Sequence, residues 1–141
     1  MIMKKNNLRV AIVTDSLFRM EGGAKVLECF AQMFPNADIY TLFSTHERHR
    51  KKHLSEDILS HKIYTSRLGK WLFVNKYYQW TLPLWPFYIE KFDFSEYDLV
   101  ISSSWSVAHG VITPLGCKHI AYINTPVRYA RDLFHTNFSN K

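Results

Sequence analysis

The feature that most constrains the fold is a pair of short apolar runs separated by one amphipathic segment. Residues 8–14 (LRVAIVT) are apolar and rich in β-branched side chains, which is typical of a buried parallel strand. Gly22 and Gly23 then open a segment whose apolar residues recur at helical spacing until Pro35. Residues 38–43 (DIYTLF) predict a second strand. The order strand, glycine turn, helix, strand predicts a βαβ unit with a right-handed crossover.

The same alternation returns in the second half of the chain. A short strand is predicted within 61–66, further strands at 98–102 and 118–123, a polar turn with a short helix at 103–110, and a helix entered through Thr125 and Pro126. Because 141 residues suffice for one domain with its own core, we expect a single domain. The alternation of strands and helices predicts an α/β fold. Its centre is predicted to be an open, mostly parallel, Rossmann-like sheet with helices on both faces.

Composition excludes several classes of protein. The chain is 47% hydrophobic and 21% charged, as expected for a folded domain. It has neither a leader-type apolar segment nor a run of about 18 apolar residues, so we expect a cytoplasmic location. Cys29 and Cys117 lie far apart, and His46, His49 and His53 lie among cations, so neither a disulfide framework nor a metal site is expected.

Charge and aromatic residues are unevenly placed. Residues 46–70 contain seven Lys and Arg against three Asp and Glu, and residues 71–97 contain 11 of the 22 aromatic residues. The aromatic segment is interpreted either as core or, because it follows a basic segment, as peripheral attachment to an anionic membrane surface. The candidate docking residues are Arg50, Lys51, Lys52, Trp71, Phe73, Trp80 and Trp85. No nucleic-acid-binding motif accompanies the basic segment, so nucleic acid is not expected as a partner.

Three turns are expected at the carboxyl ends of the strands, where α/β proteins bind ligands. They span residues 15–23, 102–104 and 124–128. Gly22 and Gly23 either let a phosphate approach the backbone amides or form a plain turn before a helix. The serines at 102–106 lack a G-x-S-x-G context and are expected to cap a turn, which argues against a serine hydrolase.

Four stretches of the chain are found together in one known family. They are AIVTDSL, EGGAKVLECFAQMFPNADIYTLF, FSEYDLVISSSWSVAHGV and HIAYINTPVRYARDLF. In this order they resemble the amino-terminal half of bacterial family 4 glycosyltransferases of the GT-B fold. These are retaining enzymes that assemble surface polysaccharides, often as mannosyl- or rhamnosyltransferases. Two Rossmann-like domains face each other across a cleft, the first binding the acceptor and the second the nucleotide-sugar.

The resemblance implies roles for individual residues. Gly22 and Gly23 match the glycine turn that approaches the donor diphosphate, although Lys25 stands where many relatives have Glu. Asn124 begins a turn often written His-Thr-Pro, whose first residue faces the transferred sugar. Asn does not carry a proton at neutral pH, so its expected role is positional. The expected acceptor-side and cleft residues are Asp15, Ser103, Ser104, Thr125, Pro126, Arg128, Tyr129 and Asp132.

The family's donor site uses a Glu-x7-Glu motif in its second domain, and no residue after Asn124 supplies that motif. The resemblance therefore implies that residues 1–141 are a single incomplete acceptor-side domain without the donor-binding domain, which would come from a longer or separate polypeptide. The expected ligands of the full enzyme are a nucleotide-sugar and a lipid-linked saccharide, with no cofactor in this chain. The alternative is a non-enzymatic basic interaction domain or a subunit that completes a second polypeptide.

Overall fold

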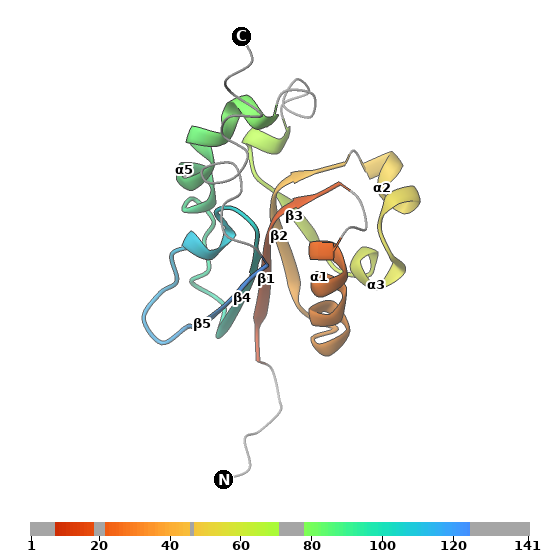
Figure 1. The fold of residues 1–141 in the computed structure, drawn as a ribbon. Helices are drawn as coiled ribbons and strands as arrows, with labels where there is room; N and C mark the ends of the chain where they lie inside the picture. The colour runs from red at the N-terminus through yellow and green to blue at the C-terminus, as the bar shows by residue number, and fades with distance from the viewer. Residues whose placement is uncertain (1–7, 19–21, 46, 71–77, 125–141) are drawn as a thin grey trace.

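A five-stranded parallel sheet forms the centre of the computed structural model, which describes residues 8–18, 22–45, 47–70 and 78–124 (Figure 1). The strands are β1 (Val10–Leu17), β2 (Asp38–Ser44), β3 (Ile63–Thr65), β4 (Leu99–Ser104) and β5 (Lys118–Ile123). The helices are α1 (Gly22–Met33), α2 (Glu47–His53), α3 (Glu56–Leu59) and α5 (Trp85–Ile89), with 3₁₀ helices η1 (Leu68–Lys70), η2 (Tyr78–Leu84) and η3 (Ala108–Gly110).

The strand order is β3-β2-β1-β4-β5, and each neighbouring pair is parallel. The chain therefore builds outward from β1 in one direction, then returns to its other side and builds outward again. This is the first part of the doubly wound order, and it confirms the predicted α/β, Rossmann-like fold. The predicted βαβ unit is β1, α1 and β2, and the predicted strand at 118–123 coincides with β5.

One face of the sheet is covered by α1 and α3. Successive side chains of a strand point to opposite faces, and Val10 and Ile12 of β1 point to this one. They pack with Leu27 of α1 and Ile58 of α3, both of which are completely buried. Helix α1 presents apolar residues at helical spacing, as predicted, and it ends where Pro35 begins a turn.

The opposite face is covered by α5 and η3 (Figure 1). Ala11 and Val13 of β1 pack here with Trp85 and Ile89 of α5. The Trp85 ring lies 5.1 Å from the ring of Phe43 and 5.6 Å from that of Trp105, measured between centroids. Part of the aromatic segment is therefore core, which was one of the two interpretations of the sequence.

The prediction that Trp85 docks on a membrane is wrong. Its side chain is 0% exposed, and its indole Nε1 donates a hydrogen bond to Thr81 Oγ1 at 2.9 Å. Trp80, by contrast, is 66% exposed. Trp71 and Phe73 lie outside the described residues. None of the described helices is long and apolar enough to cross a bilayer.

Among the described lysine and arginine side chains of the basic helix α2, one is structural and two are exposed. Arg50 is half-buried, and its Nε donates to Ser44 Oγ at 3.0 Å and to the Thr45 carbonyl at 3.2 Å. Its guanidinium links α2 to the end of β2. The prediction that Arg50 binds a membrane surface is therefore wrong. Lys51 and Lys52 are exposed, and for them the docking prediction remains open.

Candidate functional site

The candidate site is the edge of the sheet formed by the carboxyl ends of β1, β4 and β5. Strands β2 and β3 lie on one side of β1, while β4 and β5 lie on the other. The chain connections from β1 and from β4 therefore run in opposite directions across the sheet, and the topological switch point lies between these two strands. In open α/β sheets, ligands bind at the carboxyl edge beside this switch.

Asp15 of β1 organises the turn that follows β4. Its Oδ2 accepts hydrogen bonds from the backbone N–H groups of Trp105 and Ser106 at 2.8 and 3.0 Å. Its Oδ1 accepts from those of Val107 and Ala108 at 2.7 and 2.8 Å. The residue is 0% exposed. Four backbone amides thus surround the carboxylate as a nest surrounds a bound anion. Asp15 therefore shapes the edge, and the prediction that it faces a ligand is wrong.

Asn124 follows β5 and is bound to the end of β4. Its backbone N–H donates to the Ser104 carbonyl at 2.8 Å, and its side-chain Nδ2 donates to Ser103 Oγ at 3.2 Å and to the Ser104 carbonyl at 3.4 Å. Ser103 and Ser104 are each only 1% exposed. The two serines therefore support and orient the Asn124 amide from below, in place of the direct ligand contact that was predicted.

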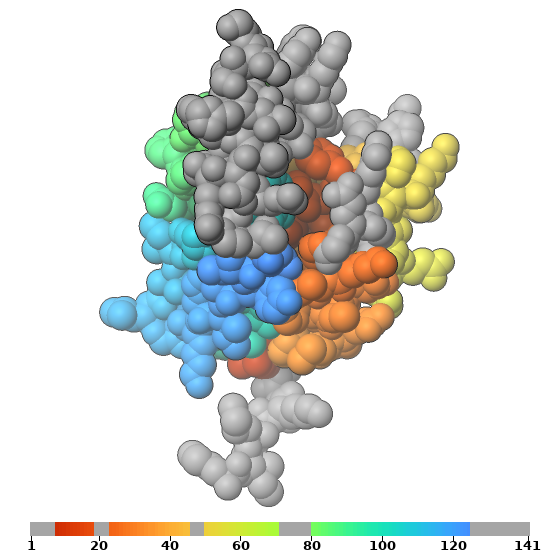
Figure 2. Space-filling view, in the orientation of Figure 1, coloured from red at the N-terminus to blue at the C-terminus, as the bar shows by residue number. Residues whose placement is uncertain are grey.

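Gly23 lies beside Asn124 although 101 positions separate them along the chain. A Cβ added to Gly23 would lie 3.7 Å from Asn124 Nδ2, which is ordinary van der Waals contact. Figure 2 shows the orange surface of α1 next to the blue surface of β5, and the rings of Phe30 and Tyr122 meet edge to face at 6.1 Å. The structure thus brings together two of the residues that the sequence singled out.

The start of α1 adds backbone donors to this edge. The first amides of a helix have no partner within the helix, and the helix dipole makes this end favourable for anions. α1 begins at Gly22, and its first turn contains no acidic residue. A Cβ at Gly23 would make only ordinary contact with Asn124, so the glycine adds no side chain between these amides and Asn124.

Two serine–histidine pairs flank β4, and the sequence did not predict them. Ser104 Oγ lies 2.9 Å from His109 Nδ1, and Ser102 Oγ lies 2.8 Å from His119 Nε2. Both serines are buried, so neither hydroxyl is accessible to a substrate as a nucleophile. The pKa of His119 is lowered, first by burial of the imidazole and then by the nearby His109. These pairs therefore stabilise the strand ends.

The remaining predicted cleft residues, Thr125, Pro126, Arg128, Tyr129 and Asp132, lie outside the described residues. The structure therefore describes the edge as far as Asn124. Within this part of the chain, the predicted residues that meet are Asp15, Gly23, Ser103, Ser104 and Asn124. No protein-family model, no curated protein and no solved structure matches the chain.

Proposed function

We propose that the chain is the acceptor-side domain of a retaining glycosyltransferase with the GT-B fold. The reaction would transfer a sugar from a nucleotide-sugar to a lipid-linked saccharide in surface polysaccharide synthesis. The observation that carries the proposal is the close approach of Gly23 to Asn124 beside the topological switch of the sheet. This is where the resemblance places the donor diphosphate and the transferred sugar.

In this proposal each described residue has a limited role. The first amides of α1 receive a donor phosphate oxygen, and Gly23 allows close approach because it has no side chain. Asn124 accepts a hydrogen bond from a hydroxyl of the sugar or of the acceptor through its Oδ1, because its Nδ2 already donates to Ser103 Oγ and to the Ser104 carbonyl. The groups that bind the nucleotide come from residues outside 1–141, so these residues alone transfer no sugar.

The test is sugar transfer by the protein at the length that its own cells make, first established by immunoblot with an antibody against residues 46–60. Membranes of those cells supply the acceptor, and GDP-mannose is the first labelled donor in a panel of nucleotide-sugars. The critical variant is Gly23→Leu, which fills the space beside Asn124. Gly110→Ala is the matched control, because a Cβ at Gly110 meets no atom within 4 Å.

We expect Gly23→Leu to reduce transfer at least tenfold while Gly110→Ala keeps the wild-type rate, because loss of a near-attack geometry has effects of that order. Thermal unfolding of both variants separates loss of transfer from loss of fold. Wild-type transfer by Gly23→Leu would remove the proposed donor position. No transfer by the wild-type protein with any donor in the panel would refute the function.

The same proposal places the protein at the inner face of the cell membrane as a peripheral protein. Lys51 and Lys52 are exposed on α2, and Trp80, Leu84 and Phe87 are 66%, 48% and 57% exposed on η2 and α5. Flotation with vesicles containing anionic lipid tests this location. Binding should weaken with salt and fall in Lys51→Gln/Lys52→Gln, and binding indifferent to lipid charge would contradict the electrostatic part.

A second candidate function is a non-catalytic subunit that completes another polypeptide. It is favoured by β5, on which Ile120, Tyr122 and Ile123 are 55%, 48% and 57% exposed. Within the described residues β5 pairs only with β4, so its outer edge offers backbone groups to another strand. A stable 1:1 complex with a nucleotide-sugar-binding protein, lost in Ile120→Lys, would favour this function over the first.

A further inference from the structure

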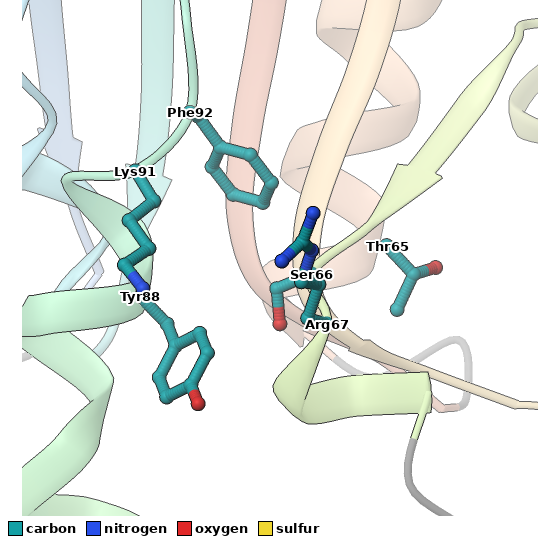
Figure 3. Close-up of a pocket in the computed structure, with 6 residues that line it drawn as sticks. All are labelled: Thr65, Ser66, Arg67, Tyr88, Lys91 and Phe92. Carbon is teal, nitrogen blue, oxygen red and sulfur yellow. The ribbon is translucent and has the colours of Figure 1, made fainter.

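A cavity lies at the carboxyl edge of the sheet on the β3 side, two strands away from β1. It has a volume of about 400 Å³, within the range of small-molecule sites. Figure 3 shows Tyr88, Lys91 and Phe92 on one side of it and Thr65, Ser66 and Arg67 on the other. The two sides come from α5 with the segment after it and from the chain that follows β3.

The hydroxyl groups of Ser66 and Thr65 are already used by the fold. Ser66 Oγ donates to the Leu42 carbonyl at 2.9 Å and accepts from the Gly69 N–H at 3.2 Å. Thr65 Oγ1 accepts from Arg50 Nη2 at 3.4 Å. Charged recognition in this cavity therefore depends on Arg67 and Lys91.

Arg67 and Lys91 both carry positive charge into the cavity. Neither forms an ion pair with any carboxylate in the described ranges, where Arg9 and Glu96 do pair, at 2.8 Å. Lys91 Nζ lies over the rings of Phe87 and Tyr88, 4.2 and 5.2 Å from their centroids, which favours this position of the ammonium group. Two cations on facing walls can bind a phosphate group through charge-assisted hydrogen bonds from both sides.

The remaining lining is aromatic. Tyr88 and Phe92 are half-buried. The Phe92 ring packs edge to face against Tyr40, with 5.1 Å between centroids, so it belongs to a fixed aromatic cluster. A ligand with only a phosphate would leave this apolar wall in contact with water.

We propose that the cavity binds a phosphate ester with an apolar substituent. The phosphate lies between Arg67 and Lys91, and the substituent covers Tyr88 and Phe92. The same chemistry is found in a lipid phosphate and in a nucleotide, whose base supplies the apolar surface. This proposal does not rest on the transferase function, since the cavity lies apart from Gly23 and Asn124 and its test measures binding alone.

Binding to the full chain is measured by calorimetry, and ¹H–¹⁵N shift changes map the site. The probes are inorganic phosphate, hexyl phosphate and adenosine 5′-monophosphate. The variants are Arg67→Gln and Lys91→Gln, with Arg67→Lys to restore the charge. Lys62→Gln is the matched control, because Lys62 is an exposed cation before β3 and does not line the cavity. All substituted side chains are exposed, and thermal unfolding checks that each variant folds.

We expect at least one ester to bind about tenfold more tightly than inorganic phosphate. Arg67→Gln and Lys91→Gln should each weaken it three- to tenfold, Arg67→Lys should restore most of the affinity, and Lys62→Gln should change nothing. Tighter binding of hexyl phosphate identifies a lipid phosphate, and tighter binding of the nucleotide identifies a nucleotide. Equal weakening in Lys62→Gln, or no binding of either ester at about 10 mM, would overturn the proposal.

Discussion

The two ends of the sheet use polar groups in opposite ways. At the amino end the Tyr97 hydroxyl donates to Asp38 Oδ2 at 2.6 Å and lies 2.9 Å from the Tyr40 hydroxyl. Arg9 pairs with Glu96 and covers the Tyr97 ring at 5.2 Å. At the carboxyl end, a buried carboxylate supports a turn, and the Asn124 amide, supported by Ser103, lies beside a glycine.

This difference separates stability from binding. At the amino end side chains satisfy one another, and the pKa of Tyr97 is raised by its burial and by its hydrogen bond to Asp38, so the phenol stays protonated. At the carboxyl end the side-chain hydrogen bonds lie below the surface, at Asp15 and the serines. Above them, the first amides of α1 have no acceptor within the helix, and Asn124 lies beside Gly23, which has no side chain. The comparison makes four predictions.

The largest expected effect is on the turn beneath the candidate site. Asp15→Ala leaves four backbone N–H groups without their acceptor, and we expect the free energy of unfolding to fall by about 3 kcal/mol or more. Urea denaturation measures this. Asp15→Asn keeps the shape and should lose less, which preserves the test if the alanine variant does not fold. Asp93→Ala, at an exposed turn, is the control, and an equal loss there would contradict a special role for Asp15.

At the amino end, Tyr97→Phe removes the hydroxyl that links Asp38 and Tyr40. We expect the free energy of unfolding to fall by about 1–2 kcal/mol, since Asp38 loses a hydrogen bond in a partly buried place. Tyr64→Phe serves as control, because Tyr64 is 43% exposed and stacks on Tyr40 through its ring. Transfer or ligand binding at the carboxyl end should remain at the wild-type level, and a parallel loss of both would show that the ends are not separate.

Gly23→Ala sharpens the comparison because it tests whether folding requires the absence of a side chain at this position. The added methyl group makes only ordinary contact with Asn124, and Ala is the better helix former. We therefore expect the free energy of unfolding to stay unchanged or rise by up to about 1 kcal/mol. Chemical denaturation beside the wild type is the measurement. A loss above about 2 kcal/mol would mean that the glycine is needed by the fold itself.

The smallest effect concerns pH. The folded-state pKa of His119 is lowered, so near pH 6.5 the unfolded chain binds more protons and stability decreases as the pH falls through that range. His119 is only partly buried, so we expect His119→Asn to reduce this decrease by a few tenths of a kcal/mol. Thermal unfolding between pH 5 and 8 measures it, with exposed His53→Asn as control. An unchanged pH profile in His119→Asn would contradict this role.

The elements that could be predicted from the sequence are those with a strong local pattern. The apolar runs at 8–14 and 98–102 mark β1 and β4, and the spacing after Gly23 marks α1. Gly23 and Asn124 could also be chosen, because carboxyl ends of parallel strands meet at one edge. Their neighbourhood follows from topology, which alternating strands and helices largely determine.

The errors concern side chains whose partners are set by the packing of the folded chain and not by the local sequence pattern. Tryptophan occurs both in cores and at interfaces, so the sequence does not show which environment Trp85 has. Its contacts with the rings of Phe43 and Trp105 in the folded chain show that it is buried. In the sequence, Arg50 cannot be distinguished from the other cations of α2, because its hydrogen bond to Ser44 is visible only in the structure. The cavity with Arg67 and Lys91 was missed for the same reason, because its two walls form only when α5 packs near β3.

The carboxylate of Asp15 also determines when the candidate site can form and open. Its four amide donors belong to residues 90 to 93 positions later in the chain, so the turn gains its acceptor only after β1 and β4 have paired. Turn amides in most proteins exchange their hydrogens with solvent quickly. Here those of residues 105–108 are expected to exchange as slowly as the central strands, because they lose protection only when the sheet opens. The site and the core therefore behave as one cooperative unit.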